Sequence, residues 1–426
     1  MTTKDMAVPW DSSPPQPVHQ VPRSLGENQG RRWPQQLSAA HPPSALPGLD
    51  TGRSKPAGMP TGMAPTALPA RDVVRPSAGV ASPASIFQPW LFEPVLAASM
   101  PSFYDVIRMC NKFDRDVGSL WEFRLLDSQG PVGYMLPEFV AEMRWDGTDF
   151  RISKAERKIH LAPRIGLGDD VVDICRLEFV KLCEKNLGVL GGVRKWLEKR
   201  CDYHPLRGLE DHLVGIKMPA PLRGVFGIVT TGTHLNVYTV KRVDGRPKMH
   251  IWVSRRSQNV TYAGKLDQIV AGAMDPRDSM DPLKTLQREA MEEAQLTVDM
   301  SSRMVTAQGT FVGTVVEGPR ISFYDKKDSV AGSEQGQLEP GVRFTFDLEV
   351  DPSFVPRPSE PDAIAGFFLK PVDDVKRDLR RAEWKPNCGL VMLDFLLRKG
   401  LIRPEDDERF SLLRQGLQRE LPFRNV

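Results

Sequence analysis

The sequence contains few cysteines and histidines and no long apolar run. None of its cysteines forms a C-x-x-C pair, and they lie scattered at Cys110, Cys175, Cys183, Cys201 and Cys388. An odd, scattered set is typical of a reducing compartment and excludes a disulfide scaffold or a cysteine-rich zinc site. The seven histidines include no H-E-x-x-H motif. No apolar segment approaches the roughly 18 residues that a membrane-spanning helix needs.

The chain also lacks a strong charge of one sign. Its 57 basic and 54 acidic residues leave a formal net charge of +3 over 426 residues. This balance argues against a general nucleic-acid binder and against a polybasic protein of membrane surfaces. The first residues carry acids and prolines in place of an apolar core, so we predict neither a secretory signal nor a typical transit peptide. We therefore predict a cytoplasmic protein, with mitochondria left open.

Composition divides the chain into three parts. Residues 1–85 hold 15 of the 37 prolines and only two aromatic residues, Trp10 and Trp33. A segment so poor in large apolar side chains cannot offset the entropy of ordering, so we predict a disordered tail. Strand-like and helix-like runs predict an α+β domain over 90–215. Pro219 and Pro221 then mark the start of a second domain, 220–426.

Alternating and helical patterns predict the elements of these two domains. In the first domain we expect strands at 120–126 and 131–136 and helices at 136–145 and 172–190. In the second we expect a hairpin of two strands, 224–243 and 248–257, around a turn at 244–245. Further strands are expected at 304–316, 320–325 and 342–350, and closing helices at 388–400 and 406–421. The fold class is therefore α+β.

One expected helix has clear terminal signals. Asp281 can act as its N-cap, and Pro282 suits the first helical position. Apolar residues then recur at spacings of three and four, which predicts one buried helix face made of Leu283, Leu286, Ala290 and Ala294.

The same helix carries three glutamates. Glu289, Glu292 and Glu293 stand at positions i, i+3 and i+4, so their side chains share one face. Because three like charges repel one another, a divalent cation is the natural counter-ion, and Mg²⁺ is usually held by carboxylates together with substrate phosphates. A remaining glutamate could serve as general base, and Arg288 could orient one carboxylate. The plain alternative is a solvated helix face.

The residues around this helix resemble a known family. The segment AGAMDPRDSMDPLKTLQREAMEEAQL (271–296) is similar to the Nudix box, G-x5-E-x7-R-E-U-x-E-E-x-G-U, in which U is apolar. The segments GTHLNVY (232–238), TYAGKLDQIVAG (261–272) and WKPNCGLVMLDFLLRKG (384–400) resemble a particular Nudix group. This group comprises the Nudix half found beside thiamine pyrophosphokinase in fungi and chloroplast Nudix relatives in plants. The resemblance covers roughly 92–423.

The resemblance implies a Nudix fold, a mixed sheet between helices, preceded by a smaller α+β domain. It implies Mg²⁺ or Mn²⁺ bound by Glu289, Glu292 and Glu293, with Arg288 as the orienting arginine. The implied reaction is hydrolysis of a diphosphate linked to another moiety, with thiamine diphosphate or its damaged forms yielding the monophosphate and phosphate. Isomerase chemistry on this fold would need a cysteine near the metal, and the strands before the box carry none.

Several positions depart from the family pattern. Met280 stands where the earlier glutamate of the box is expected, and Gln295 replaces the closing glycine, which implies strain or a different helix exit. Downstream, Ala363 and Ala365 occupy positions where carboxylates are expected, and Glu360 and Asp362 are the candidates to substitute for them. These departures support an alternative function, a catalytically silent Nudix-fold protein that binds or senses a ligand.

Some residues outside the helix are candidates for substrate contact. Arg255 and Arg256 follow a strand and could clamp a diphosphate, or they could be solvated or paired with acids. Asp267 could recognise a cationic or amino-bearing ring, or it could stabilise a turn. Lys385 could touch substrate or pack in a loop. His234 and Cys388 are interpreted as structural residues.

Overall fold

The structure of the protein is a computed structural model that describes residues 102–114 and 116–423. The predicted disordered tail, residues 1–85, lies outside the described residues. Within them, no helix combines the length and the apolar character required to cross a membrane.

A four-stranded sheet forms the first part of the described chain, in the order β2-β1-β4-β3. Its strands are β1 (Trp121–Leu125), β2 (Gly133–Met135), β3 (Phe150–Ser153) and β4 (Lys158–Leu161). The sequence predicted β1 and β2. It missed β3 and β4 because each has only four residues, which is too short for an alternating pattern to stand out. Helices accompany the sheet, namely α2 (Pro137–Glu142), α3 (Val171–Lys185) and α4 (Val193–Lys199).

The core of this first sheet includes a residue from the following segment. The ring of Phe226 lies 4.6 Å from that of Phe123 and 6.2 Å from that of Phe179, measured between ring centroids. The chain turns beside it at Gly227, which has a φ of 55°. A Cβ at Gly227 would lie 2.1 Å from the carbonyl oxygen of Tyr134. The predicted strand 224–243 is therefore wrong at its start, and the strand begins at residue 230.

Three short elements lead from the first sheet to the second. They are β5 (Tyr203–Pro205), β6 (Lys217–Pro219) and the four-residue helix α5 (Ala220–Arg223). Strands β5 and β6 pair with each other. Short 3-10 turns lie at Val117–Ser119, Asp211–Leu213, Pro276–Asp278, Ser329–Glu334 and Pro404–Asp406.

The second sheet has nine strands, with the main path β11-β12-β13-β14-β7-β8-β15. Strand β10 pairs with β7, and β9 pairs with β8. Because β14 and β7 are parallel while their other neighbours are antiparallel, the sheet is mixed. Its strands are β7 (Thr230–Val243), β8 (Arg246–Arg256), β9 (Leu266–Asp267), β10 (Val270–Ala273), β11 (Leu296–Val298), β12 (Met304–Ala307), β13 (Thr310–Lys326), β14 (Leu338–Glu349) and β15 (Ile364–Pro371).

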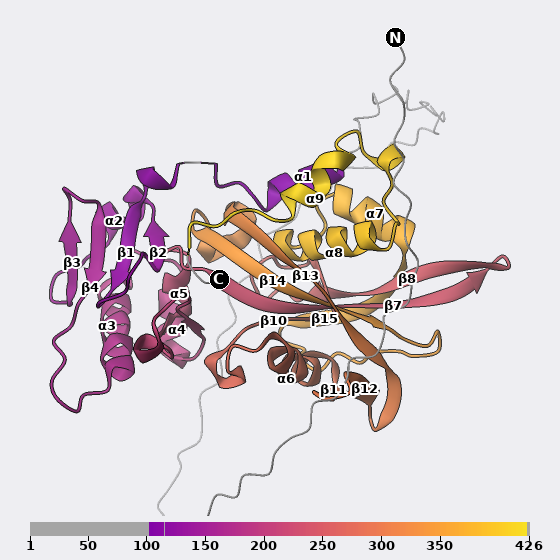
Figure 1. Cartoon of the computed structure of the whole chain (residues 1–426), viewed down its shortest axis with the longest axis horizontal. Coiled ribbons are helices and arrows are strands. Elements are labelled where there is room, and N and C mark those ends of the chain that lie inside the picture. The colour runs from indigo at the N-terminus through magenta and orange to yellow at the C-terminus, as the bar shows by residue number, and fades with distance from the viewer. Residues whose placement is uncertain (1–101, 115, 424–426) are drawn as a thin grey trace, which may run out of the picture. The chain divides into compact units, whose positions relative to one another are not determined.

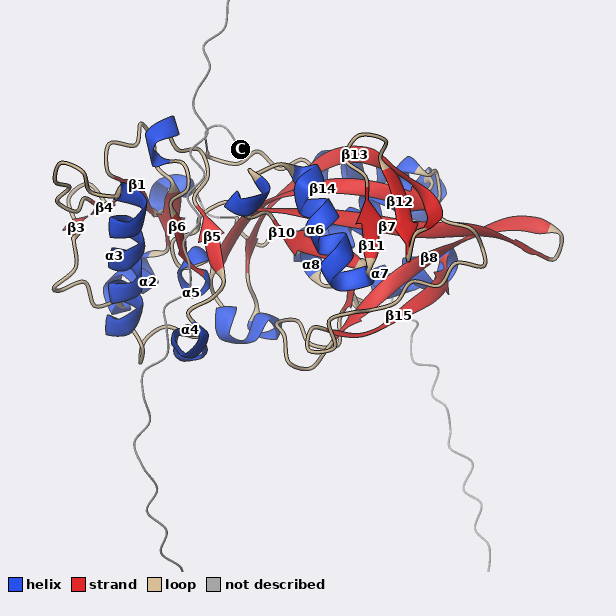
Figure 2. Cartoon of the chain, turned by 90° about the horizontal axis from the view of Figure 1, so that it is seen from below, coloured by secondary structure: helices blue, strands red, loops and turns tan. Residues whose placement is uncertain are grey.

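Helices cover both faces of this sheet, as the family resemblance implied. Helix α6 (Pro282–Ala294) packs on one face through Leu286 and Ala290. The other face carries α7 (Val372–Arg380), α8 (Pro386–Arg398), α9 (Phe410–Gly416) and also α1 (Phe103–Met109), which share a separate core. Figure 1 shows α6 and α8 on opposite sides of the strands, and Figure 2 shows the strands from the side of α6. The predicted helix 406–421 is shorter than expected, and α7 and β15 were missed.

Candidate active site

Helix α6 begins as the sequence predicts. Asp281 is its N-cap and accepts the backbone N–H of Leu283 at 2.8 Å, and Pro282 occupies the first helical position. The predicted apolar face is buried, since Leu283, Leu286, Ala290 and Ala294 are all in the core. The glutamates therefore lie on the remaining part of the helix surface, next to β10.

Strand β10 lets two of these glutamates approach its backbone closely. A Cβ at Gly272 would lie 1.8 Å from Cδ of Glu289, so any side chain at this position would collide with the carboxylate. The neighbouring residue, Ala271, donates its backbone N–H to Oε2 of Glu293 at 2.7 Å. Glu289 and Glu293 are thus held against the strand.

Arg288 connects the carboxylates of the helix to the preceding loop. Its guanidinium lies 2.8 Å from Glu289, 2.9 Å from Glu292 and 2.9 Å from Asp278. Asp278 is buried and also accepts the hydroxyl of Thr285 at 3.0 Å. The structure therefore gives Arg288 an anchor that the sequence did not reveal. Counted back from Arg288, the expected acid falls on Met280, but counted forward from Gly272, the spacing G-x5-E falls on Asp278. The two extra residues therefore lie between Asp278 and Arg288.

Burial dominates the electrostatics of the two glutamates beside β10. Burial raises the pKa of Glu289 to about 7, opposed by Arg288 and assisted by Glu292 and Glu360. Burial and the charge of Glu289 raise the pKa of Glu293 well above its usual value. The only nearby cation of α6 is Arg288, whose own pKa is lowered by burial but raised more by Asp278 and Glu289. A crowded oxygen donor set of this kind fits Mg²⁺ or Mn²⁺.

A fourth carboxylate lies near the end of α6. The backbone N–H of Ser359 donates to the carbonyl oxygen of Glu293 at 3.0 Å, which brings the next residue, Glu360, toward the helix. Burial and the charge of Glu292 raise the pKa of Glu360. Of the two acids considered as substitutes for Ala363 and Ala365, Glu360 is the one that couples to the three glutamates. Asp362 is exposed.

Two cavities meet beside α6. An outer cavity of about 790 Å³ is lined by Arg288, Glu289 and Glu292. An inner cavity of about 260 Å³ is lined by the three β10 residues 271–273. The two cavities adjoin each other, because both are lined by His204, Arg223, Thr261, Ala273 and Glu334. Together they are called the cleft. Glu293 lines neither cavity and lies behind the other two glutamates.

The inner cavity is rich in cations. Five basic residues line it, and they come from distant parts of the chain: Arg223, Arg256, Lys327, Arg343 and Lys385. The sequence indicated Arg256 and Lys385 but missed the other three, because a single basic residue outside a motif gives no signal. Arg255 does not line either cavity, and its guanidinium donates to the carbonyl oxygen of Gly264 at 2.8 Å. Asp267 also lines neither cavity and pairs with Arg256 at 2.9 Å.

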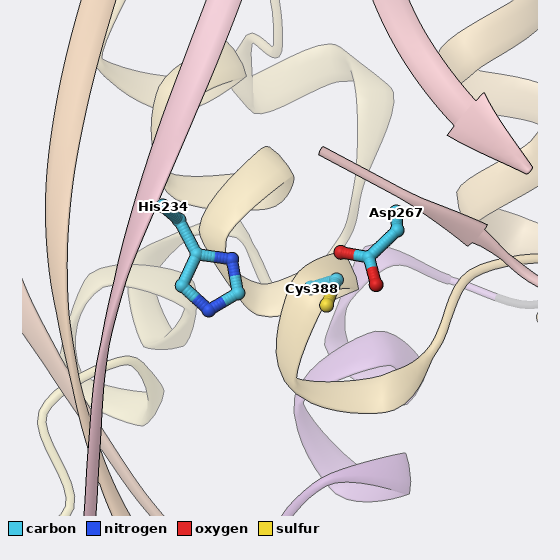
Figure 3. Close-up of side chains that lie close together, drawn as sticks. All are labelled: His234, Asp267 and Cys388. Carbon is cyan, nitrogen blue, oxygen red and sulfur yellow. The ribbon is translucent and has the colours of Figure 1, made fainter. Parts of the chain in front are cut away.

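A second group of potential metal ligands lies at the wall of the inner cavity, which His234 lines. The ligand atoms of His234, Asp267 and Cys388 lie within 4.8 Å of one another, and all three residues are buried (Figure 3). The sequence did not reveal this group, because its members come from β7, β9 and α8. Arg256 and Lys385 already surround Asp267, at 2.9 and 3.8 Å. Because these two cations would repel a metal ion, the cluster is better explained as part of the polar wall.

The chain leaves α6 in a strained conformation. Gln295 has φ 54° and ψ 35°, the left-handed conformation that a closing glycine would supply. Of the two alternatives raised by the sequence, strain is therefore correct, and the helix exit keeps the glycine geometry. Met280, at the position of the expected glutamate, also has a positive φ of 53°.

Three relatives are similar to this chain in sequence. An uncharacterized protein of Saccharomyces cerevisiae is 32% identical over 206 residues, which cover 47% of this chain and 56% of the yeast protein. In that alignment the chain spans little more than half of its relative. Two relatives from Arabidopsis thaliana, both named chloroplastic, are 26% identical to this chain. They are Nudix hydrolase 20, aligned over 337 residues, and Nudix hydrolase 24, aligned over 326 residues. Both alignments cover 76% of this chain and 80% of the plant protein. No family model matches the chain.

Proposed function

We infer that this chain, a member of the Nudix superfamily, hydrolyses a phosphoanhydride bond in a diphosphate linked to another moiety. The observation that carries this inference is the placement of Glu289 and Glu292 in the wall of a cavity, with Glu293 directly behind them. Carboxylates crowded in this way require a counter-charge, and only one arginine of the helix supplies it.

We propose that Glu289, Glu292 and Glu293 hold Mg²⁺ or Mn²⁺ and that Arg288 orients the first two. When bound, such an ion lowers the pKa of a water molecule and stabilises negative charge on a phosphate. A carboxylate that is not occupied as a ligand accepts the proton of the attacking water. Water then attacks phosphorus, and a phosphate ester or orthophosphate leaves. Glu360 is an additional carboxylate available to this set, since its charge raises the pKa of both Glu289 and Glu293.

Within this class, we propose thiamine diphosphate or its damaged forms as substrates, with the monophosphate and phosphate as products. The resemblance to the thiamine-associated Nudix group supports this choice. A cytoplasmic location and the absence of nucleic-acid and membrane partners belong to the same proposal.

The direct test is phosphate release from thiamine diphosphate, its oxidised analogues and a panel of nucleoside diphosphates, with and without Mg²⁺ or Mn²⁺. We expect metal-dependent release from at least one of them. Glu292→Gln and Glu293→Gln should each lower the rate by about a hundredfold or more, because ligands and base are lost together. Glu317→Gln is the matched control, since Glu317 lies on β13 with 61% of its side chain exposed. Absence of metal-dependent release from every compound would exclude the proposal.

A silent ligand-binding protein is the second candidate. It is favoured by the absence of carboxylates at Met280, Ala363 and Ala365 and by the strained exit at Gln295. It predicts that calorimetry detects binding of a diphosphate while the phosphate assay remains flat. Turnover that depends on Glu292 and Glu293 would exclude it.

A further inference from the structure

We propose that the inner cavity is a phosphate-binding site that holds the unsubstituted terminal phosphate of the substrate, while the organic moiety occupies the outer cavity. This assignment rests on the proposed function, because it places the two ends of a diphosphate in the two parts of one cleft. It adds a site that no residue of α6 lines and whose five cations all lie outside the family motif.

The chemistry of the inner cavity favours an anion. Its lining contains no aliphatic side chain larger than alanine, and Tyr262 is its only aromatic residue. The charged groups of the lining are five cations and two carboxylates, which leaves a formal charge of 5 − 2 = +3. The two histidines of the lining add no charge at neutral pH, because burial lowers the pKa of both His204 and His234 to about 3. A neutral ring would find little apolar surface here.

The two carboxylates of the lining do not oppose an anion, because the chain neutralises them itself. Glu334 accepts both Nη2 hydrogen bonds of Arg223, at 2.7 and 2.8 Å, and also pairs with Lys327. Glu339 lies 2.7 Å from the guanidinium of Arg343 and 3.2 Å from Lys327. Three cations thus balance two acids in a fixed framework with one positive charge left over.

The other two cations have hydrogen-bonding capacity to spare. Both face Asp267, which lies 2.9 Å from Arg256 and 3.8 Å from Lys385. At 3.8 Å the ammonium of Lys385 is beyond hydrogen-bonding distance from that carboxylate, so its donors can turn to a ligand. Lys385 directly precedes α8, a helix of 13 residues whose N-terminus faces the cavity through Asn387. The helix dipole adds to the positive potential there.

The sizes of the two cavities determine the orientation in which the substrate binds. The inner cavity has about 260 Å³, below the range of about 300–1,000 Å³ that is typical of pockets for organic ligands. The outer cavity has about 790 Å³ and includes the ring of Tyr203 and the side chain of Met274. Glu289 lies between the two, because it lines the outer cavity and contacts Gly272 of the inner one. The bond to be cleaved therefore lies at this junction, with the small anionic group inside.

This arrangement restricts the substrate class. A diphosphate with an organic group on both phosphates would have to place one of them among buried charges, which is costly. The chain should therefore act on diphosphates with a free terminal phosphate and release orthophosphate. Arg223 and His204 belong to the segment before the large sheet, so this segment contributes directly to the site.

Binding of inorganic phosphate to the full-length protein tests the site without turnover. In the presence of EDTA, calorimetry should show saturable binding of one orthophosphate, and Lys385→Met should weaken it at least tenfold. Lys248→Met is the matched control, because Lys248 is exposed on the β7–β8 hairpin. No saturable binding, or equal binding by the Lys385 variant, would overturn the site.

Matched substrate pairs test the direction. In each pair, we expect kcat/KM to be at least tenfold higher for the compound with a free terminal phosphate. ADP should therefore exceed ADP-ribose, and UDP should exceed UDP-glucose. The comparison applies to every pair of which at least one member is hydrolysed. Equal or reversed ratios would overturn the proposal while leaving the hydrolase function intact. If no compound is hydrolysed but phosphate binds through Lys385, the proposed function fails and the phosphate site stands.

Discussion

Burial opposes the ionisation of the glutamates at both ends of the cleft, yet their pKa values shift in opposite directions. In α6, burial raises the pKa of Glu289 to about 7 and that of Glu293 well above its usual value, because only Arg288 is close. At the inner end, burial also opposes ionisation, but Arg223 and Lys327 lower the pKa of Glu334 to about 2. Glutamate is thus a structural residue where the chain supplies cations that pair with it. Where the chain supplies too few cations, glutamate is available to bind an external cation.

The largest expected effect comes from removing the carboxylate of Glu334, which pairs with Arg223 and Lys327 at the inner end of the cleft. Glu334→Met leaves Arg223 and Lys327 short of a partner in a buried place. We expect the free energy of unfolding to fall by about 3–5 kcal/mol, the usual result of removing one member of a buried ion pair. Guanidinium-induced unfolding measures it, with Glu317→Met as the exposed control. A loss below that of the control would mean that the charges at this end are solvated.

The pH dependence of stability sharpens the same contrast. The folded-state pKa of Glu334 is about 2, below its ordinary value of 4.5, so the ionised form stabilises the fold. This contribution is complete above about pH 4.5 and is lost as the pH falls from there toward 2, at about 1.4 kcal/mol for each pKa unit. Unfolding measured between pH 6 and 2 should show this loss in the wild type and a flatter curve in Glu334→Gln. Parallel curves would contradict it.

At the end of the cleft beside α6, the position of the Glu289 carboxylate depends on the absence of a side chain at Gly272. Gly272→Ala would push a methyl group into the carboxylate of Glu289, whose Cδ lies 1.8 Å from the Cβ position. We expect metal-dependent turnover to fall about a hundredfold, as is typical when a catalytic group is displaced by about 1 Å. Gly366→Ala is the control, because its Cβ would meet only ordinary contacts at 3.5 Å. Full activity in Gly272→Ala would show that the position of Glu289 is not critical.

Replacing Arg288 should weaken metal binding less than replacing the glutamates that it orients. Arg288→Lys replaces a guanidinium that contacts three carboxylates with a single ammonium, while the charge is kept. We expect affinity for Mn²⁺ to fall by about 10–100-fold, as for other residues that position metal ligands. Titration calorimetry with Mn²⁺ measures it, and Arg246→Lys, on the exposed hairpin, should have no effect. Unchanged affinity would leave Arg288 without an orienting role.

The smallest expected effect concerns the exit of α6. Gln295 adopts a left-handed conformation that glycine occupies at little cost. Gln295→Gly should therefore raise the free energy of unfolding by up to about 1 kcal/mol, reduced by the greater freedom of glycine in the unfolded chain. Thermal unfolding measures the shift, and a decrease would mean that the glutamine side chain makes a contact that offsets the strain.

The sequence was sufficient where an element carries its own local signals. Helix α6 was predicted from its cap, its proline and its apolar spacing, and the mixed sheet between helices followed from the family resemblance. Short strands such as β3 and β4 have too few residues for a pattern. The expected strand 224–243 begins only at residue 230, because the chain turns at Gly227, which lies against Tyr134, a residue distant in sequence.

The remaining part of the cleft depends on chain topology. Arg223, Lys327 and Arg343 lie more than a hundred residues apart at their extremes, and only the folded sheet brings them together. Asp278 lies close to α6 in sequence, yet a longer loop hides its relation to Arg288. Isolated charges of this kind become informative only when their neighbours are known.

The position of Arg223 has a practical consequence for work with shortened forms of the protein. A fragment that starts at Thr230 would retain every strand of the large sheet and all of α6, and by secondary structure it would look complete. It would nevertheless lack the guanidinium that holds Glu334 and the imidazole of His204 beside it. Such a fragment would present an opened cleft in which Glu334 keeps only Lys327 as a partner, so its ligand preferences would not report those of the whole chain.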